Sequence, residues 1–268
     1  NEYIHYQTIE KSDGNLYKVS PAGATQTYNA GNPINKSVLL VGSFAYIVTD
    51  NGQLHKVDTI GMTQVWTYQA TSTVATLPSY SASRDIIIFA TDDLFVHAVN
   101  NNSGIQKWRV KPSPNTPGGN TLTDGGTPTG SQFERGWPVI ADKSGVVLVR
   151  MQLNHDDMTV GPNGGVFDTT NSANRAWLQA NPQYRDSFAL NLDDGSEKFI
   201  PVTGYGTTED YLGTAAYGVM GTQPVVKELA NGKEVAYMIF RNGQSYPLTD
   251  YRWSGHMGEM VFDNTTVP

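Results

Sequence analysis

The chain has 268 residues, a formal net charge of −7 and a pI of about 5.1, with 16 % charged residues, 10 % aromatic residues and no Cys. The aromatic content and moderate charge exclude a disordered chain, and the acidic balance without a Lys/Arg run excludes a nucleic-acid binder, which needs a basic surface. No apolar run approaches the roughly 18 residues of a membrane-spanning helix, and the absence of Cys excludes disulfides, thiolate metal sites and Cys nucleophiles.

The predicted elements, taken in chain order, are short strands. Apolar or alternating runs bounded by turn residues are typical of strands, and they occur at 3–8, 37–40, 45–49, 86–90, 139–141, 146–150 and 235–240. No segment keeps a 3.6-residue apolar period, and residues 172–180 are the one stretch compatible with either a helical turn or a loop. The sequence therefore predicts an all-β fold.

Four hairpins repeat one pattern. Each has an aliphatic residue, a polar turn that contains Gly, and an aromatic residue nine positions after the aliphatic one. The pairs are Val19/Tyr28, Val57/Trp66, Val99/Trp108 and Leu190/Phe199. Gly, Asn and Asp tolerate the positive φ of a tight turn, and the ring on the returning strand buries a large area between neighbouring sheets. We expect the four aromatic residues to occupy equivalent positions in successive sheets.

The spacing of this repeat predicts the blades of a β-propeller. The motif aromatics are separated by 38, 42 and 91 residues, counted from 28 to 66, 66 to 108 and 108 to 199. A four-stranded antiparallel blade takes about 40 residues, so the last interval holds one blade with roughly 50 inserted residues. The insertions lie at about 112–134 and 152–185, which are rich in Pro, Gly, Asn, Thr and Asp. We expect both to be structureless surface loops.

The hairpin pattern Ala-Leu-Asn-x-x-x-Gly-x-x-x-aromatic, followed by a Pro-Val-Val strand and a short Val/Tyr/Ile strand, resembles the pyrroloquinoline-quinone-type (PQQ-like) β-propeller repeat. The resemblance covers about residues 12–245, and its best copies are 97–108 and 188–199. It implies a seven- or eight-bladed propeller of which about four blades are visible. Residues 1–268 are then a single propeller domain or a part of one. Because the family includes both quinoprotein alcohol dehydrogenases and non-enzymatic assembly factors of the outer membrane, the resemblance leaves the activity open.

The two insertions carry the candidate ligand-binding residues. Phe133, Arg135, Trp177 and Tyr184 lie in these segments or directly after the first. Aromatic and Arg side chains are the residue types that most often anchor a partner at an interface. We expect them to lie together on one propeller face.

Oxygen ligands are densest in the second insertion. Asp156, Asp157, Asn163 and Asp168 surround a Gly-rich turn. Calcium takes carboxylate and amide oxygens from such loops, but the spacing does not match the twelve-residue helix–loop–helix pattern. A solvated loop is the favoured interpretation, and a calcium site is the alternative.

PQQ is not an expected cofactor. The resemblance implies that in quinoprotein dehydrogenases the quinone stacks on a Trp beside a calcium ion, and that many of these enzymes also use a Cys pair. This chain has no Cys, and its Trp66 and Trp108 are accounted for by packing between blades. No catalytic residue can be assigned. The chain is therefore not expected to be an enzyme, although this remains open.

Several other polar residues have structural interpretations. His55 and His97 fall at equivalent strand positions of consecutive blades, which favours packing over a metal site. Asp92 and Asp93 occupy a turn, where Asp is common. Sequons at Asn35, Asn101 and Asn264 leave glycosylation open.

These observations lead to a functional hypothesis. We expect an exported, non-enzymatic PQQ-like propeller that acts as a binding or scaffold module through its loop face, in the periplasm, at the cell surface or secreted. The chain begins without Met, which we interpret as the loss of preceding residues. Its partner would be a protein or a polysaccharide, together with the remainder of its own propeller or a second chain. The alternatives are a quinoprotein-like oxidoreductase completed by a missing part, and a structural subunit of a surface assembly.

Overall fold

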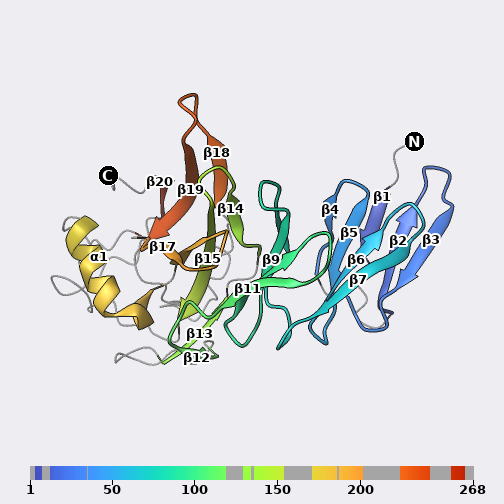
Figure 1. The fold of residues 1–268 in the computed structure, drawn as a ribbon, viewed down its shortest axis with the longest axis horizontal. Coiled ribbons are helices and arrows are strands. Elements are labelled where there is room, and N and C mark those ends of the chain that lie inside the picture. The colour runs from blue at the N-terminus through green and yellow to red at the C-terminus, as the bar shows by residue number, and fades with distance from the viewer. Residues whose placement is uncertain are drawn as a thin grey trace. The chain divides into compact units, whose positions relative to one another are not determined.

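The computed structural model describes residues 4–7, 13–34, 36–118, 129–133, 136–153, 171–185, 187–201, 224–241 and 255–262. Residue contacts divide the chain into two compact units, Asn1–Val110 and Lys111–Pro268, which are described separately (Figure 1). Strands dominate both units, which confirms the all-β prediction. No helix among these residues is long and apolar enough to cross a membrane.

The first unit consists of three antiparallel sheets in which each strand pairs with the next one along the chain. The first sheet has three strands, β1 (Ile4–Gln7), β2 (Asn15–Val19) and β3 (Thr25–Asn29). The second has four, β4 (Leu39–Val41), β5 (Phe44–Val48), β6 (Gln53–Asp58) and β7 (Thr63–Gln69). The third also has four, β8 (Ser79–Ser81), β9 (Ile86–Ala90), β10 (Val96–Asn100) and β11 (Gln106–Val110).

The second unit contains two further sheets (Figure 1). Four strands of the larger one repeat the order of the first unit: β14 (Val139–Ala141), β15 (Val146–Leu153), β16 (Ser187–Asn191) and β17 (Glu197–Phe199). Two more strands, β12 (Thr116–Pro117) and β13 (Gly130–Phe133), extend it. The other sheet contains β18 (Val225–Glu228), β19 (Glu234–Arg241) and β20 (Gly255–Val261). Helix α1 (Asn171–Ala180) coincides with the predicted helix-compatible stretch, and the short 3-10 helix η1 (Pro182–Tyr184) follows it.

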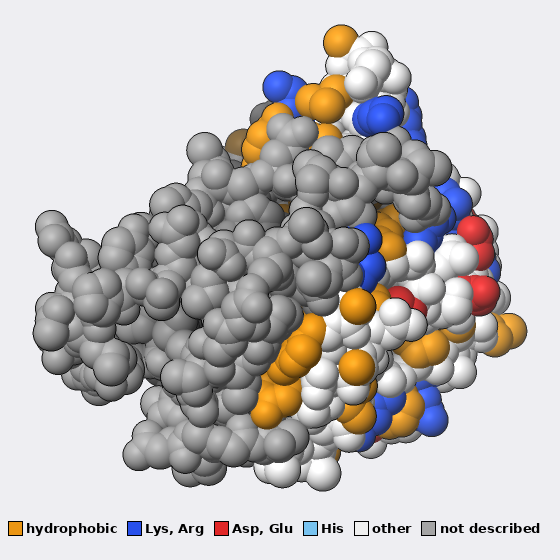
Figure 2. Space-filling view, turned by 90° about the vertical axis from the view of Figure 1, so that its left-hand side faces the viewer, with side chains coloured by type: hydrophobic (Ala, Val, Ile, Leu, Met, Phe, Trp, Pro, Cys, Tyr) orange, Lys and Arg blue, Asp and Glu red, His pale blue; other side chains and the backbone are white. Residues whose placement is uncertain are grey.

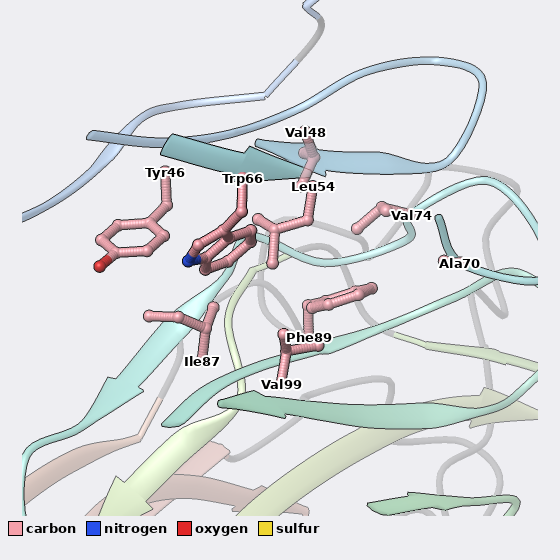
Figure 3. Close-up of a cluster of buried hydrophobic side chains, with 9 residues drawn as sticks. All are labelled: Tyr46, Val48, Leu54, Trp66, Ala70, Val74, Ile87, Phe89 and Val99. Carbon is pink, nitrogen blue, oxygen red and sulfur yellow. The ribbon is translucent and has the colours of Figure 1, made fainter. Parts of the chain in front are cut away.

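Apolar side chains fill the space between consecutive sheets. Figure 3 shows one such cluster, in which Trp66 and Leu54 of the second sheet point toward Ile87, Phe89 and Val99 of the third. All five side chains are buried. Burial of this apolar surface at roughly 25 cal/mol per Å² is the main force that joins one sheet to the next.

Gly104, in the turn between β10 and β11, receives the ring of Trp66 from the preceding sheet. A Cβ atom on Gly104 would lie 2.8 Å from Cδ2 of Trp66, and the φ angle of Gly104 is +71°. The indole N–H of Trp66 donates to the carbonyl oxygen of Asn101 at 2.9 Å. The ring can approach this closely because Gly has no side chain, and Gly also tolerates the positive φ.

Three of the four motif aromatics occupy equivalent positions. Trp66, Trp108 and Phe199 pair with Lys56, Ala98 and Ala189, and in each case the register shifts directly after that partner. This bulge is part of the repeated hairpin and re-aims the strand that carries the ring.

The prediction for Tyr28 is wrong in register. Tyr28 pairs with Leu16 without a bulge, as Tyr68 pairs with Leu54 in the next sheet. Twelve positions separate the first pair and fourteen the second, counted from 16 to 28 and from 54 to 68. The β2–β3 hairpin is therefore two residues shorter between the equivalent pairs, and Tyr28 is the counterpart of Tyr68 rather than of Trp66.

A recurrent backbone hydrogen bond follows the third strand of four sheets. The N–H of the residue directly after this strand donates to the carbonyl before the second strand or at its first residue. The bonds are Thr59 to Ser43, Asn101 to Asp85, Leu192 to Gly145 and Phe262 to Glu234, at 2.9, 2.9, 3.0 and 3.2 Å. The repeat therefore extends into the sheet β18–β20, where the sequence carries no aromatic hairpin motif.

Candidate functional site

The first insertion is attached to the blade through one long strand. Val146–Leu148 of β15 pair with β14, whereas Met151–Leu153 pair with β13. Ser131 and Phe133 are buried on β13. The prediction that residues 112–134 are structureless is therefore wrong for 116–117 and 130–133, where β12 and β13 continue the sheet beyond the four strands of the blade.

The second insertion contacts the first. Nδ2 of Asn115 in the first insertion donates to the carbonyl oxygen of Gln183 in the second at 3.0 Å. Asn115 is 4 % exposed, so this hydrogen bond is shielded from water. Trp177 of α1 and Tyr184 of η1 pack with ring centroids 5.1 Å apart. The described parts of the two insertions are therefore in direct contact, as the single-face hypothesis requires.

A buried guanidinium holds the helical segment against the blade. Nε of Arg185 donates to the carbonyl oxygen of Leu178 at 2.9 Å, and Nη1 lies 2.5 Å from Oε1 of Glu197 on β17. Burial lowers the pKa of Arg185 and raises that of Glu197, and in both cases the partner's charge opposes the effect of burial. The hydrogen bonds that Arg185 donates fix the position of α1 and η1 against the blade.

The predicted anchor residues are divided between surface and interior. Phe133 and Tyr184 are 5 % and 6 % exposed, so in this structure they lie beneath the surface. Trp177 is half-buried, and Arg135 lies outside the described residues. Sequence reasoning missed Trp137, which is 47 % exposed directly after the first insertion. Figure 2 shows one face of the molecule, on which hydrophobic side chains of the described residues lie among polar ones.

The predicted calcium ligands Asp156, Asp157, Asn163 and Asp168 lie outside the described residues. Within the described ranges, no group of three or more His, Asp and Glu side chains is arranged to hold a metal ion. Calcium binding by the second insertion stays a prediction.

Trp66 and Trp108 do not fit the role of a ring that stacks on a quinone. The ring of Trp66 rests on Gly104 with its N–H bonded to Asn101, and Trp108 is 6 % exposed. Neither ring is free to stack on a quinone. No step through a quinone is therefore derived for this chain.

The other candidate side chains in the first unit form hydrogen bonds with neighbouring side chains of the same chain. Asp93 accepts hydrogen bonds from the hydroxyls of Thr71 and Thr91, which, against the effect of burial, hold its pKa below the ordinary value. His55 and His97 lie at equivalent positions, as predicted, and each contacts a tyrosine hydroxyl. Both histidines therefore take part in packing between sheets, which is the interpretation that their sequence positions favoured.

Asn101 is the centre of a buried hydrogen-bond network. Its Nδ2 donates to Oδ1 of Asp85 at 2.7 Å, and its Oδ1 accepts from the Tyr46 hydroxyl and from Nζ of Lys56. The residue is 9 % exposed. A similar lysine contact joins the first two sheets, where Nζ of Lys18 donates to the carbonyl oxygen of Thr59 at 2.8 Å. The side-chain amide of Asn101, the acceptor residue of its sequon, is thus engaged in hydrogen bonds within the protein. Asn35 and Asn264 lie outside the described residues.

Comparison with known proteins shows similarity at the level of fold. No family model and no curated protein matches the chain. A europium-containing methanol dehydrogenase is 14 % identical with a TM-score of 0.53, and the match covers 90 % of this chain and 45 % of that one. BamB from Moraxella catarrhalis is 15 % identical with a TM-score of 0.48, covering 91 % and 63 %. The quinohemoprotein alcohol dehydrogenase from Comamonas testosteroni is 16 % identical with a TM-score of 0.47, covering 85 % and 38 %.

The chain spans less than two thirds of each of these proteins. Identities this low carry the fold and not the activity. The successive antiparallel sheets and the match to the methanol dehydrogenase together show the β-propeller fold that the repeat predicted.

Proposed function

We infer that the chain is a binding module whose partner surface is built by the two insertions in the sheet that contains β15. The hydrogen bond from Asn115 to Gln183 carries this proposal, because it joins segments far apart in sequence into one patch. Residues that bind partners are concentrated on loops that a rigid scaffold positions. The partner is a protein or a polysaccharide.

The proposal includes an extracytoplasmic location and a non-enzymatic role. It also includes completion of the propeller by further chain, from the same polypeptide or from a second one. What supports this last point is the extent of the match in fold, since the chain spans 45 % of the methanol dehydrogenase.

Photo-crosslinking tests the surface. A photoreactive phenylalanine replaces Trp177, and a matched control replaces Ile60, which is 72 % exposed in the β6–β7 turn of the first unit. We expect a discrete crosslinked product from position 177 and none from position 60 in cells that produce the protein. Affinity electrophoresis with purified polysaccharides compares the unmodified chain with Trp177→Ala. Equal products at both positions, with no effect of Trp177→Ala on polysaccharide retardation, would refute the proposed surface.

The oxidoreductase alternative has its own test. The purified chain is incubated with PQQ, calcium and a primary alcohol, and reduction of an artificial electron acceptor is recorded. We expect no reduction above the rate of free PQQ. Turnover that depends on the protein would contradict the non-enzymatic proposal.

A further inference from the structure

Two Tyr–His pairs join consecutive sheets of the first unit with the same geometry. The Tyr28 hydroxyl on β3 lies 2.9 Å from Nδ1 of His55 on β6. The Tyr68 hydroxyl on β7 lies 3.0 Å from Nδ1 of His97 on β10. The rings meet edge to face, with centroids 6.0 Å and 5.9 Å apart. We call these contacts the first junction, between sheets β1–β3 and β4–β7, and the second junction, between sheets β4–β7 and β8–β11.

A glutamine completes each pair and fixes the position of the protons. Tyr28 donates to Oε1 of Gln64 at 3.0 Å, and Tyr68 donates to Oε1 of Gln106 at 2.8 Å. A phenol has one proton, so a tyrosine that donates to the amide must accept from the imidazole. Nδ1 of each histidine therefore carries a proton, and Nε2 is the acceptor atom of the neutral ring.

The two histidines differ at Nε2. In His97 this atom lies 3.1 Å from the Thr91 hydroxyl, which donates in turn to the Asp93 carboxylate. In His55 it is buried without a hydrogen-bond partner among the described residues, and the side chain is 3 % exposed. A second proton at His97 thus meets an acceptor with a negative charge behind it, whereas a second proton at His55 meets none.

The turns that precede the two histidines differ at the residue that the threonine hydroxyl contacts. Thr49 and Thr91 begin the same turn, each donating its backbone N–H to the carbonyl four residues later. The Thr49 hydroxyl donates to Oδ1 of Asn51 at 2.6 Å, where Thr91 has Asp93 instead. A carboxylate at this position stabilises a nearby imidazolium, and a neutral amide does not.

We propose that His55 is an acid-sensitive latch, so that acid opens the first junction of the propeller before the second. A buried N–H group with a positive charge and no acceptor is strongly unfavourable, so protonated His55 is stable only when its ring reaches water. Leaving the site breaks the contact with Tyr28 and frees sheet β1–β3. Protonated His97 keeps both of its hydrogen bonds.

The groups that face each ring leave the two pKa values alike. Around His55 they are the Tyr28 hydroxyl from β3 and the Gln64 amide from β7, and burial alone lowers its pKa to about 4. Burial also lowers the pKa of His97 to about 4, an effect that the Asp93 charge opposes and the Arg109 charge increases. The acceptor chain through Thr91 then decides which junction keeps its structure when its histidine is charged.

NMR of the full chain between pH 7.5 and 3.5 tests the latch. Labelled histidine rings report protonation, a Leu16 methyl group reports the packing of the first junction, and an Ile87 methyl group reports the second. Both reporters belong to the buried clusters at those junctions. We expect the native Leu16 signal to disappear at a higher pH than the native Ile87 signal. Simultaneous loss of the two signals would overturn the proposal.

Exchanging the turn residues provides the matched test. Asn51→Asp gives the first junction the carboxylate of the second, and we expect its opening to move down by about one pH unit. Asp93→Asn is the reverse change, and we expect it to move the opening of the second junction up by a similar amount. Asn51 is exposed, so its substitution is compatible with folding. An unchanged midpoint in Asn51→Asp would refute the latch, whatever the stability of the other variant.

Discussion

Replacing Gly104 by Ala tests whether the Trp66 ring rests on the turn of the next sheet. The new Cβ would lie 2.8 Å from Cδ2 and 2.9 Å from Cγ of the ring, closer than real Cβ contacts, at a φ of +71°. An L-residue in the left-handed region costs roughly 1–2 kcal/mol, and overpacking a buried contact costs roughly 1–3 kcal/mol more. We therefore expect Gly104→Ala to lower the free energy of unfolding by about 2–5 kcal/mol.

Gly23→Ala is the matched control for the backbone. Its φ is +81°, and no atom lies within 4 Å of the added Cβ. We expect this variant to lose only the backbone cost of about 1–2 kcal/mol. The effect of Ala on the unfolded chain is similar in both variants and cancels in the comparison.

The assay is urea unfolding of both variants, followed by tryptophan fluorescence and by far-UV circular dichroism. Coincident transitions from the two probes justify the comparison of free energies. A difference of about 1–3 kcal/mol between the variants supports the contact with Trp66. If Gly104→Ala is no less stable than Gly23→Ala, the ring does not rest on this turn.

Three further predictions concern pH, modification and the candidate site. His55 and His97 have pKa values lowered to about 4 from 6.5, so their contribution to stability is complete above pH 6.5 and is lost as the pH falls toward 4. We expect each to contribute up to about 3 kcal/mol in urea titrations at pH 7 relative to pH 4, and a midpoint independent of pH would contradict this. Expression in a host that glycosylates proteins should leave Asn101 unmodified in the folded protein, as peptide mass spectrometry will show, because its Nδ2 is buried and bonded to another side chain. Glu197→Gln should lower the free energy of unfolding by about 1–3 kcal/mol and make the α1 segment accessible to trypsin. Glu228→Gln, which removes an exposed ion pair, should lower it by less than about 1 kcal/mol. Equal effects of the two substitutions would count against the role of the buried Arg.

The repeat could be predicted from sequence because its turn needs particular residues. A turn that contains Gly and a large ring nine positions after an aliphatic residue identify Trp66 and Trp108 correctly. Tyr28 has the same spacing, but its hairpin is two residues shorter and has no bulge, so Tyr28 is shifted by two positions. A bulge leaves no trace in an apolar pattern, so this shift could not be predicted. The sheet β18–β20 was missed as a copy of the motif because it shares only a backbone hydrogen bond.

The candidate site was only partly predictable. The composition of the two insertions marked their limits, but the pairing of β13 with β15 and the bond from Asn115 to Gln183 are non-local contacts. Residue type alone does not say which way a ring faces, so the burial of Phe133 and Tyr184 was not foreseen. The tyrosine partners of the two histidines leave a detectable signal, because Tyr28 and Tyr68 recur 40 positions apart, counted from 28 to 68.

The double use of β15 limits how this protein can vary. Val149 faces Phe188 in the blade, and Met151, two positions along the same strand, faces Phe133 of the insertion. Side chains alternate between the two faces of a strand, so one added or lost residue within Val146–Leu153 would invert every position after it. Changes of length that preserve both the blade core and the insertion surface must therefore keep the parity of this strand. New binding specificities can arise freely in the loops, but only changes of even length can enter the strand that carries them.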